Sequence, residues 1–416
     1  MSAPRGKIRK PVHNSSENRS RLRICYLVAY FHPFESGAER QALTQGRELV
    51  RRGHQVHVVT HAMPGVPREG EVDGIRVHRW VHSSKRGPLF SVTFVAGAVR
   101  ALGRLRREVD LIHTHQALWE AVAAGVARGS GWVRGVPTLV QPASSGYYGE
   151  AEELLRTRGA NALRRLILRN DAFVAISADI ERQWLALGVP RARLVRIASG
   201  VDARHYAPGA SRSEAALPPR PRVVFTGRLH PQKNLDVLLD AWPAVVRRTG
   251  ATLVLAGQGP ERDRLEEKAR ALGVAPHVCF TGSVADVADV LRAADVFALP
   301  SVAEGMSNSL LEAMATGLPC VASDIGGNQD LLGPGPAGVL VAGTTPEHWA
   351  ESLIALLTDP DRRAGLGATA RRRVDEEFAV ERVVDRYEEL YRRLIARHRT
   401  SEAELNPSAD DADERR

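Results

Sequence analysis

The sequence lacks the features of a secreted, disulfide-bonded or membrane-spanning protein. Its apolar runs are all shorter than the roughly 18 residues that a membrane-spanning helix needs. Residues 1–20 are basic and polar, without the apolar core of a secretory signal. Cys25, Cys279 and Cys320 lie far apart and form no CxxC pair, which argues against a disulfide framework or a zinc site. These absences predict a protein that works in the reducing cytoplasm.

Aromatic residues are also scarce, at 5% of the chain, and no nucleic-acid-binding motif is present. The formal net charge is nevertheless +9, so an anionic partner needs consideration. Two arginine-rich stretches, residues 100–107 and 156–169, belong to helical patterns with an apolar side. A basic amphipathic helix can lie on an anionic membrane, although the solvated face of a core helix has the same pattern. The composition therefore predicts no nucleic-acid partner and leaves peripheral contact with the inner face of the cell membrane open.

What the chain does have is an alternation of short β-branched runs with longer amphipathic helical patterns. Helices are expected, among others, at residues 39–52, 152–170, 234–248, 308–316 and 380–398. The expected strands are 24–31, 56–60, 75–80, 111–115, 138–140, 172–177, 223–226, 252–256, 278–281, 296–299, 320–323 and 339–341. Alternation with continuously apolar strands predicts an α/β protein with parallel sheets covered on both faces. So many strands favour two doubly wound domains over one open sheet.

The break between the two domains is expected near residues 199–221, where glycines and prolines interrupt the pattern. This divides the chain into a first Rossmann-like domain at 21–198 and a second at 199–379. A last helix at 380–399 follows the finished second domain and can pack back on the first. We expect the basic tail at 1–20 and the acidic tail at 400–416 to be disordered.

The most informative stretch follows the expected strand 296–299 and opens a helix. In such folds ligands bind at the carboxyl ends of strands, over helix N-termini. Glu304 lies in this loop and can reach a transferring sugar, whereas Glu312 lies one turn into the helix and can bond ribose hydroxyls. The same spacing, Ser309-x-x-Glu312, also fits a capping box that merely starts the helix. The backbone amides that suit a diphosphate are those at the loop and helix start, Gly305, Met306, Ser307, Asn308 and Ser309.

Two cations follow the expected strand 223–226. The strand ends at Gly227, and Arg228 and Lys233 project from the next loop. Beside a pyrophosphate they would stabilise the charge that grows on the leaving group. The alternative is a surface loop with solvated cations. No GxxxxGK[ST] pattern is present, so the loop is not a Walker A motif.

The first domain contributes weaker signals. Gly37 follows the first strand and would let the backbone approach a donor phosphate or an acceptor, although an ordinary strand-to-helix turn has the same features. His113 and His115 alternate along one strand, so they share a face, with His115 nearer the carboxyl end. A core histidine satisfied by hydrogen bonds is the usual explanation for either one. No carboxylate or cysteine near them in the sequence completes a metal ligand set.

At Glu304 and Glu312 the chain resembles the glycosyltransferase family 4 group of retaining enzymes, in which two glutamates separated by seven residues mark the donor site. The resemblance extends over residues 23–395, because the Gly227-Arg228…Lys233 motif and others follow in the family's order. It implies the GT-B fold, two Rossmann-like domains whose parallel sheets face across a cleft. It also implies that His115 contacts the donor sugar and that the backbone around Val284 holds the nucleotide base. Ser36, before Gly37, replaces a glycine usual in the family.

The resemblance further implies a retaining hexosyltransferase that uses a nucleotide diphosphate sugar, either a UDP-sugar or GDP-mannose. No metal or other cofactor is expected, because the two cations Arg228 and Lys233 can do the work of a donor metal. Glu304, His115, Arg228 and Lys233 form the expected catalytic set. The acceptor is expected to be a glycan, a lipid-linked glycan or a small molecule, and it faces the loop at residues 141–148. Two alternatives remain open at this point, a nucleotide-sugar epimerase and a non-catalytic nucleotide-sugar-binding subunit on the same fold.

Overall fold

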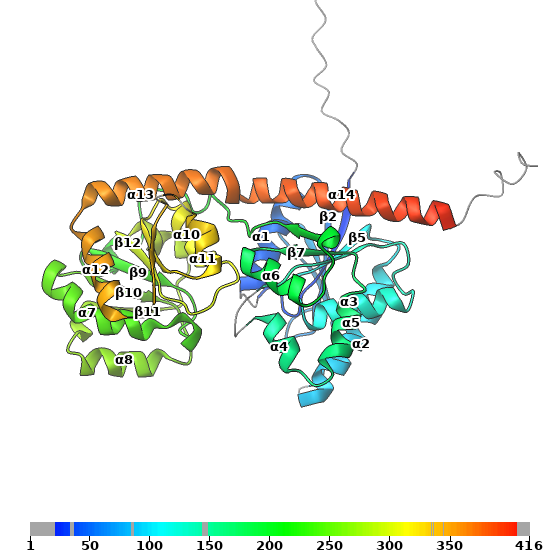
Figure 1. The fold of residues 1–416 in the computed structure, drawn as a ribbon, viewed down its shortest axis with the longest axis horizontal. Helices are drawn as coiled ribbons and strands as arrows, with labels where there is room; N and C mark the ends of the chain where they lie inside the picture. The colour runs from blue at the N-terminus through cyan, green and yellow to red at the C-terminus, as the bar shows by residue number, and fades with distance from the viewer. Residues whose placement is uncertain are drawn as a thin grey trace, which may run out of the picture.

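The computed structural model describes residues 21–405 apart from 34–36, 85–86, 144–148, 334, 336 and 344. Two lobes lie side by side, each a mainly parallel sheet with helices on both faces (Figure 1). The expected tail at 1–20 and most of the expected tail at 400–416 lie outside the described residues. Within the part described, no helix combines the length and apolar character that a bilayer crossing requires.

The first lobe is built on an eight-stranded sheet with the order β3-β4-β2-β1-β5-β6-β7-β8. All neighbouring strands run parallel except β3, which is antiparallel to β4 at one edge. The strands are β1 (Arg23–Leu27), β2 (Gln55–His61), β3 (Glu69–Val72), β4 (Ile75–Val81), β5 (Leu111–Thr114), β6 (Thr138–Val140), β7 (Ala172–Ala175) and β8 (Leu194–Arg196). The helices are α1 (Gly37–Arg51), α2 (Gly87–Leu105), α3 (Trp119–Gly129), α4 (Glu150–Arg156), α5 (Ala160–Ile167) and α6 (Ala178–Ala186).

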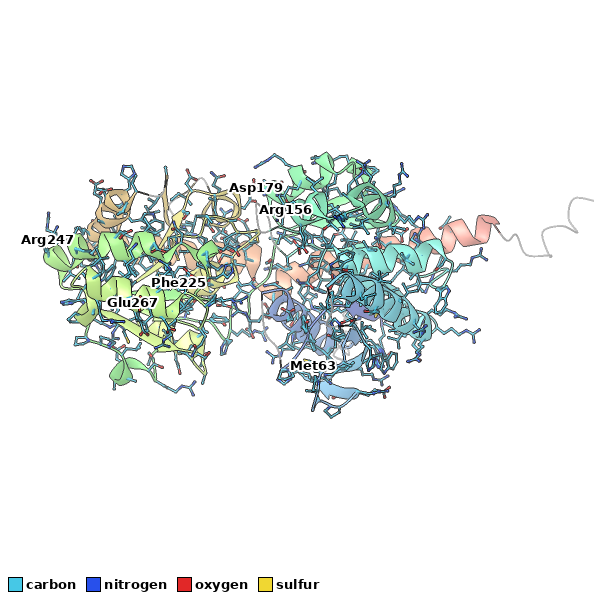
Figure 2. The ribbon with its side chains drawn as sticks, turned by 90° about the horizontal axis from the view of Figure 1, so that it is seen from below. Met63, Arg156, Asp179, Phe225, Arg247 and Glu267 are labelled. Carbon is cyan, nitrogen blue, oxygen red and sulfur yellow. The ribbon has the colours of Figure 1, made fainter. Side chains whose placement is uncertain are left out.

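The second lobe has a six-stranded parallel sheet with the order β11-β10-β9-β12-β13-β14, the doubly wound order of dinucleotide-binding folds. Its strands are β9 (Arg222–Thr226), β10 (Thr252–Ala256), β11 (Val278–Gly282), β12 (Val296–Leu299), β13 (Cys320–Ser323) and β14 (Val339–Val341). Its helices are α7 (Leu235–Thr249), α8 (Arg262–Ala271), α9 (Val287–Arg292), α10 (Asn308–Ala315), α11 (Gly326–Leu332), α12 (Pro346–Leu357) and α13 (Pro360–Arg373). Phe225, at the middle of the second lobe in Figure 2, is fully buried.

The predicted α/β class and the two parallel sheets are confirmed, but some elements differ from expectation. The single helix expected at 152–170 is wrong, because Gly159 adopts a left-handed φ of 80° and separates α4 from α5. The first strand ends at Leu27, four residues earlier than expected. Strands β3 and β8 were not predicted, since β3 is an exposed, charged edge strand and β8 is only partly buried.

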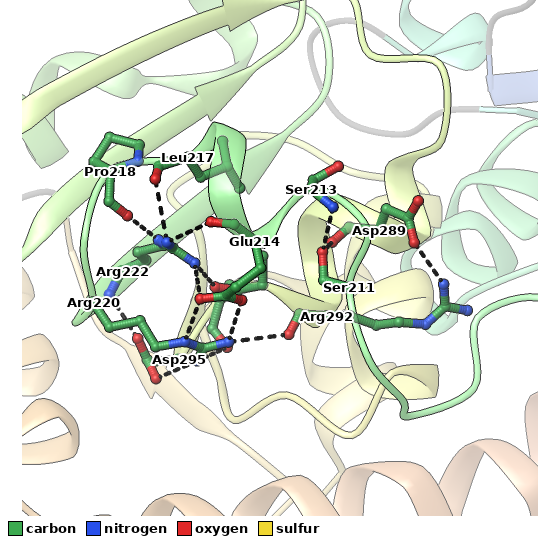
Figure 3. Close-up of polar contacts among 12 residues, drawn as sticks. Ser211, Ser213, Glu214, Leu217, Pro218, Arg220, Arg222, Asp289, Arg292 and Asp295 are labelled. Atoms are coloured by element: carbon green, nitrogen blue, oxygen red, sulfur yellow. Dashed lines mark hydrogen bonds and ion pairs between the residues drawn. The ribbon is translucent and has the colours of Figure 1, made fainter.

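The segment that joins the lobes is fixed to the second sheet by a buried arginine (Figure 3). Arg222 opens β9 and is 3% exposed. Its guanidinium donates to the carbonyl oxygens of Pro218, Leu217 and Ala293, and it pairs with Glu214 at 2.8 Å. Donation to several carbonyls satisfies a group that would be costly to bury unpaired, so residues 214–222 have a defined path.

The chain crosses between the lobes a second time after α13. A π-helical turn (Val374–Phe378) leads into α14 (Val380–Leu405), which runs along the first lobe in Figure 1. Val201 and Ala379 form a parallel bridge, so the two crossings lie side by side. Within the first lobe, the hydroxyl of Tyr387 lies 2.6 Å from Gln141 Oε1, and that of Tyr391 lies 2.8 Å from His113 Nδ1.

Candidate active site

A cavity of about 320 Å³ lies between the lobes at the carboxyl ends of both sheets. The first lobe contributes Gly37, Ala38, Arg40, Gln41, His115, Gln141, Pro142, Ala143 and Ile176. Ser199 and the second lobe complete the lining with Gly227, Arg228, Gln232, Lys233, Glu304, Met306, Ser307, Asn308 and Ser309. The loop after β9 and the loop after β12 therefore open into one space, together with the first-lobe histidine.

The two loops of the second lobe are hydrogen-bonded to each other. Lys233 Nζ lies 2.5 Å from Glu304 Oε1, which also accepts from Ser301 Oγ at 2.7 Å. The Gln232 side chain donates to the carbonyl oxygen of Ala303 at 2.7 Å. Lys233 and Glu304 thus form a partly buried ion pair in the cavity wall, with a fixed position relative to each other.

Arg228, unlike Lys233, is not held by a carboxylate. It is exposed, lines the cavity, and has no hydrogen bond or ion pair with another described residue. Its loop depends on close backbone packing, because a Cβ on Gly257 would lie 1.8 Å from the carbonyl oxygen of Gly227. A Cβ on Gly259 would similarly lie 2.1 Å from that of Leu229. These two glycines after β10 hold the Arg228 loop, and the sequence interpretation missed them.

Helix α10 presents its N-terminal end to the cavity. Ser307 is the N-cap, and its hydroxyl accepts from the backbone N–H of Leu310 at 3.3 Å. The capping-box alternative with Ser309 is therefore wrong, because Ser309 lies inside the helix. The amides of Asn308 and Ser309 belong to the first turn, where backbone N–H groups have no carbonyl partner within the helix and attract anions.

His115 stands in the first-lobe wall of the cavity. It is 1% exposed, and neither ring nitrogen has a hydrogen-bond partner among the described residues. Burial lowers the pKa of His115 to about 3, so the ring is neutral and offers one donor and one acceptor. His113 shares its face, with ring centroids 4.3 Å apart, but bonds Tyr391. Of the two, His115 lines the cavity and His113 does not, so His115 is the one that a ligand in the cavity can contact.

Three of the predicted donor-site residues, Glu312, Val284 and Gly305, are not among the residues that line this cavity. Glu312 lines a neighbouring cavity of about 420 Å³, where its carboxylate lies 3.2 Å from Arg40 and burial raises its pKa. The two cavities adjoin, since both are lined by Arg40, Gln41 and Asn308. Val284 packs against the core of the second lobe. Gly305 is buried, with its carbonyl oxygen 2.7 Å from where a Cβ on Gly327 would lie.

The structure also bears on the remaining predictions. Among the described residues, no cluster of histidine, cysteine, aspartate or glutamate is arranged to hold a metal ion.

Pro142 and Ala143 of the expected acceptor loop line the cavity, whereas residues 144–148 and Ser36 lie outside the described part of the chain. Arg40, Gln41 and Gln141 were missed, because single polar residues in helices or after strands give no motif.

Two glycosyltransferase family models match the chain, one to each lobe. Glycosyltransferase Family 4 matches residues 36–205, and Glycosyl transferases group 1 matches residues 220–359. Among solved structures, sucrose-phosphate synthase from Thermosynechococcus elongatus aligns with a TM-score of 0.76 at 24% identity, covering 90% of this chain and 99% of that one. Anabaena HepE in complex with UDP and glucose aligns with a TM-score of 0.72 at 21% identity, covering 89% and 99%. The fold is that of the GT-B glycosyltransferases.

Curated relatives narrow the class to a family. D-inositol 3-phosphate glycosyltransferase of Rhodococcus opacus is 31% identical over 417 residues, which is 92% of each chain. A GDP-mannose-dependent phosphatidylinositol monomannoside mannosyltransferase of Mycobacterium tuberculosis is 35% identical over 52% of this chain and 60% of its own. The protein belongs to glycosyltransferase family 4, and it is an enzyme of the glycosyltransferase class.

Proposed function

We propose that the protein is a retaining glycosyltransferase that moves a hexose-type sugar from a nucleotide diphosphate sugar to a hydroxyl of its acceptor. The observation that carries this proposal is the single cavity that contains Arg228, Lys233, the start of α10 and the neutral His115. The cations and helix-end amides suit the diphosphate, while His115, with its unsatisfied ring nitrogens, suits the hydroxyls of the sugar. Glu312, next to this cavity, is then the group that binds the ribose once Arg40 releases it.

In the proposed reaction the glycosidic bond to the diphosphate breaks as negative charge grows on the leaving oxygen. Arg228 and Lys233 stabilise that charge, since both line the cavity proposed for the diphosphate. The acceptor hydroxyl arrives on the same face of the sugar and gives its proton to the departing phosphate. Glu304 holds Lys233 in place and contacts the sugar. Water is excluded by the closed lobes, which favours transfer over hydrolysis.

Metal is not required in this proposal, because Arg228 and Lys233 supply the positive charge that a metal ion would otherwise provide. The resemblance to family 4 supports a UDP-sugar or GDP-mannose as donor. The names of the similar proteins do not decide between these two donors. One relative is named as GDP-mannose-dependent, and one structural neighbour was solved with UDP and glucose. For the acceptor they name D-inositol 3-phosphate and a phosphatidylinositol monomannoside. The first is a small molecule and the second is lipid-linked, and the sequence leaves both kinds of acceptor open. We propose the cytoplasm as the place of the reaction.

Donor and acceptor can be identified in two steps. Thermal unfolding with UDP-sugars and GDP-mannose should show stabilisation by one donor, since binding to the folded state raises the melting temperature. That donor is then incubated with D-inositol 3-phosphate, lipid-linked glycans and soluble sugars, and the products are analysed by mass and anomeric configuration. Transfer with retention, unaffected by a chelator, is the expected result.

Other outcomes would contradict the proposal in distinct ways. An inverted product would remove the retaining mechanism, and loss of transfer that only a divalent metal restores would remove the metal-free account. Isomerised donor without any acceptor would instead indicate an epimerase, and donor binding without turnover a silent subunit. Neither alternative is favoured by the relatives, which are named glycosyltransferases.

A further inference from the structure

Gln41 connects three parts of the molecule, namely α1, the first crossing between the lobes and the start of α10. This side chain of α1 is 8% exposed and lines both interlobe cavities. Its Nε2 donates to the carbonyl oxygen of Gly200 at 2.8 Å and to Asn308 Oδ1 at 2.9 Å. Its Oε1 accepts from the backbone N–H of Gly200 at 3.1 Å. Asn308 in turn donates to the carbonyl oxygen of Gly37 at 3.0 Å.

Each of these partners has a role in how the lobes meet. Gly200 belongs to the first crossing between the lobes, where a Cβ would lie 3.2 Å from the Cα of Val380 in the second crossing. Asn308 begins α10, whose amides face the cavity. Gly37 begins α1 on the opposite wall. The carboxamide of Gln41 therefore ties the crossing to the start of α10, and the carboxamide of Asn308 ties the start of α10 to the start of α1.

We propose that Gln41 is a positioning residue that couples closure of the lobes to assembly of the diphosphate end of the site. The inference rests on the proposed function for the identity of the ligand, but not for the closure itself. Both hydrogens of Nε2 face acceptors, so no isosteric acid can replace the amide. A carboxylate in its place would lose both donations and repel two oxygens at a largely buried position.

The test uses the full chain with Gln41→Glu and Gln41→Met, and Gln329→Glu as a matched control on the exposed face of α11. Titration calorimetry with UDP and with GDP measures binding of the diphosphate. We expect Gln41→Glu to weaken the better nucleotide at least tenfold, since two hydrogen bonds are lost. Gln329→Glu should bind as the wild type does. If Gln41→Glu fails to fold, Gln41→Met, which removes the same bonds without a charge, gives the measurement.

A second arm asks whether the effect passes through Asn308. In an Asn308→Ala background, the further loss caused by Gln41→Met should fall below about twofold, because the two changes remove one shared connection. Losses that simply multiply would show that Gln41 acts independently of α10 and would overturn the inference. Wild-type nucleotide affinity in both Gln41 variants would do the same.

A third arm needs no nucleotide. Small-angle X-ray scattering of the ligand-free proteins should show a larger radius of gyration for Gln41→Glu than for the wild type or Gln329→Glu. If the wild type binds neither UDP nor GDP, the proposed function fails, and this arm alone decides the inference. An unchanged radius of gyration would then overturn it.

Discussion

At the scale of single residues, the two cations of the cavity differ in how they are held. Lys233 is fixed by Glu304, so it needs no reorganisation when a leaving group gains charge. Arg228 has no partner among the described residues and remains available to a phosphate. An ammonium held by a carboxylate and an unpaired guanidinium in the same cavity can together bind a diphosphate.

Replacing either cation should damage the chemistry without unfolding the protein. We expect Arg228→Ala and Lys233→Ala each to reduce kcat on the order of a hundredfold, the usual cost of a lost transition-state donor. Steady-state transfer rates with the identified donor provide the measurement. Arg264→Ala and Lys268→Ala are matched controls, because both side chains bind Asp236 on the outer face of the second lobe. Rates near wild type in both site variants would contradict the proposed roles.

The buried histidine makes stability depend on pH. Unfolded His115 would bind a proton below its ordinary pKa of about 6.5, whereas the folded ring, with a pKa of about 3, does not. The contribution of the neutral His115 ring to the free energy of unfolding is thus fully present above pH 6.5. This contribution is lost as the pH falls toward 3, by up to about 1.4 kcal/mol per pH unit. Urea unfolding at pH 7, 6 and 5 should show a shallower decline for His115→Asn. His348→Asn, on the exposed face of α12, should keep the wild-type slope.

At the scale of elements, the loops after β9 and β10 pack at backbone distance. Gly257 has a φ of 154° and accommodates the carbonyl oxygen of Gly227 where a Cβ would stand. A side chain at this position must push the Arg228 loop out of the cavity. The shape of the Arg228 loop, and with it the position of Arg228, therefore depends on a glycine in the neighbouring loop after β10.

We consequently expect Gly257→Ala to weaken donor binding strongly while the protein still folds. We expect the donor Kd to rise at least tenfold and the free energy of unfolding to fall by about 1–3 kcal/mol, the cost of backbone strain. Calorimetric titration and urea unfolding measure the two effects. Gly365→Ala is the control, since no atom lies within 4 Å of its added Cβ and alanine favours the interior of α13. Equal behaviour of the two variants would contradict this account.

The sequence predicted the elements that have strong periodicity and missed those set by tertiary contacts. Continuous apolar strands and the helix at α10 were predictable from pattern alone. The break at Gly159 was not, because a lone glycine inside a helical pattern is often tolerated. The spacing Ser309-x-x-Glu312 fitted a capping box, yet Ser307 caps the helix. Only the fold shows that Arg40, which is far away in the sequence, forms an ion pair with the carboxylate of Glu312.

At the scale of the whole molecule, α14 connects the end of the second lobe to the first lobe. Arg52, at the end of α1, is 17% exposed and contacts Glu388 at 3.0 Å and Asp385 at 2.6 Å on α14. It also bonds Glu48 at 2.7 Å. Glu48 and Glu388 are almost completely buried, and Arg52 is the cation that both share. Glu48 also pairs with Arg51, and Glu388 also contacts His54 and Arg392. The cluster holds the returning helix against α1, which carries Gln41 and lines both cavities.

Removing Arg52 should therefore weaken the connection between the lobes as well as the local structure. We expect Arg52→Met to lower the free energy of unfolding by about 1.5–3 kcal/mol, because two buried carboxylates lose the hydrogen bonds of their shared cation while their other cationic partners remain. Arg264→Met, which breaks exposed ion pairs, should cost less than about 1 kcal/mol. Urea unfolding measures both values, and limited trypsin digestion reports whether α14 is cleaved earlier. A loss for Arg52→Met no larger than for Arg264→Met, with α14 equally protected, would show that apolar packing alone holds the helix.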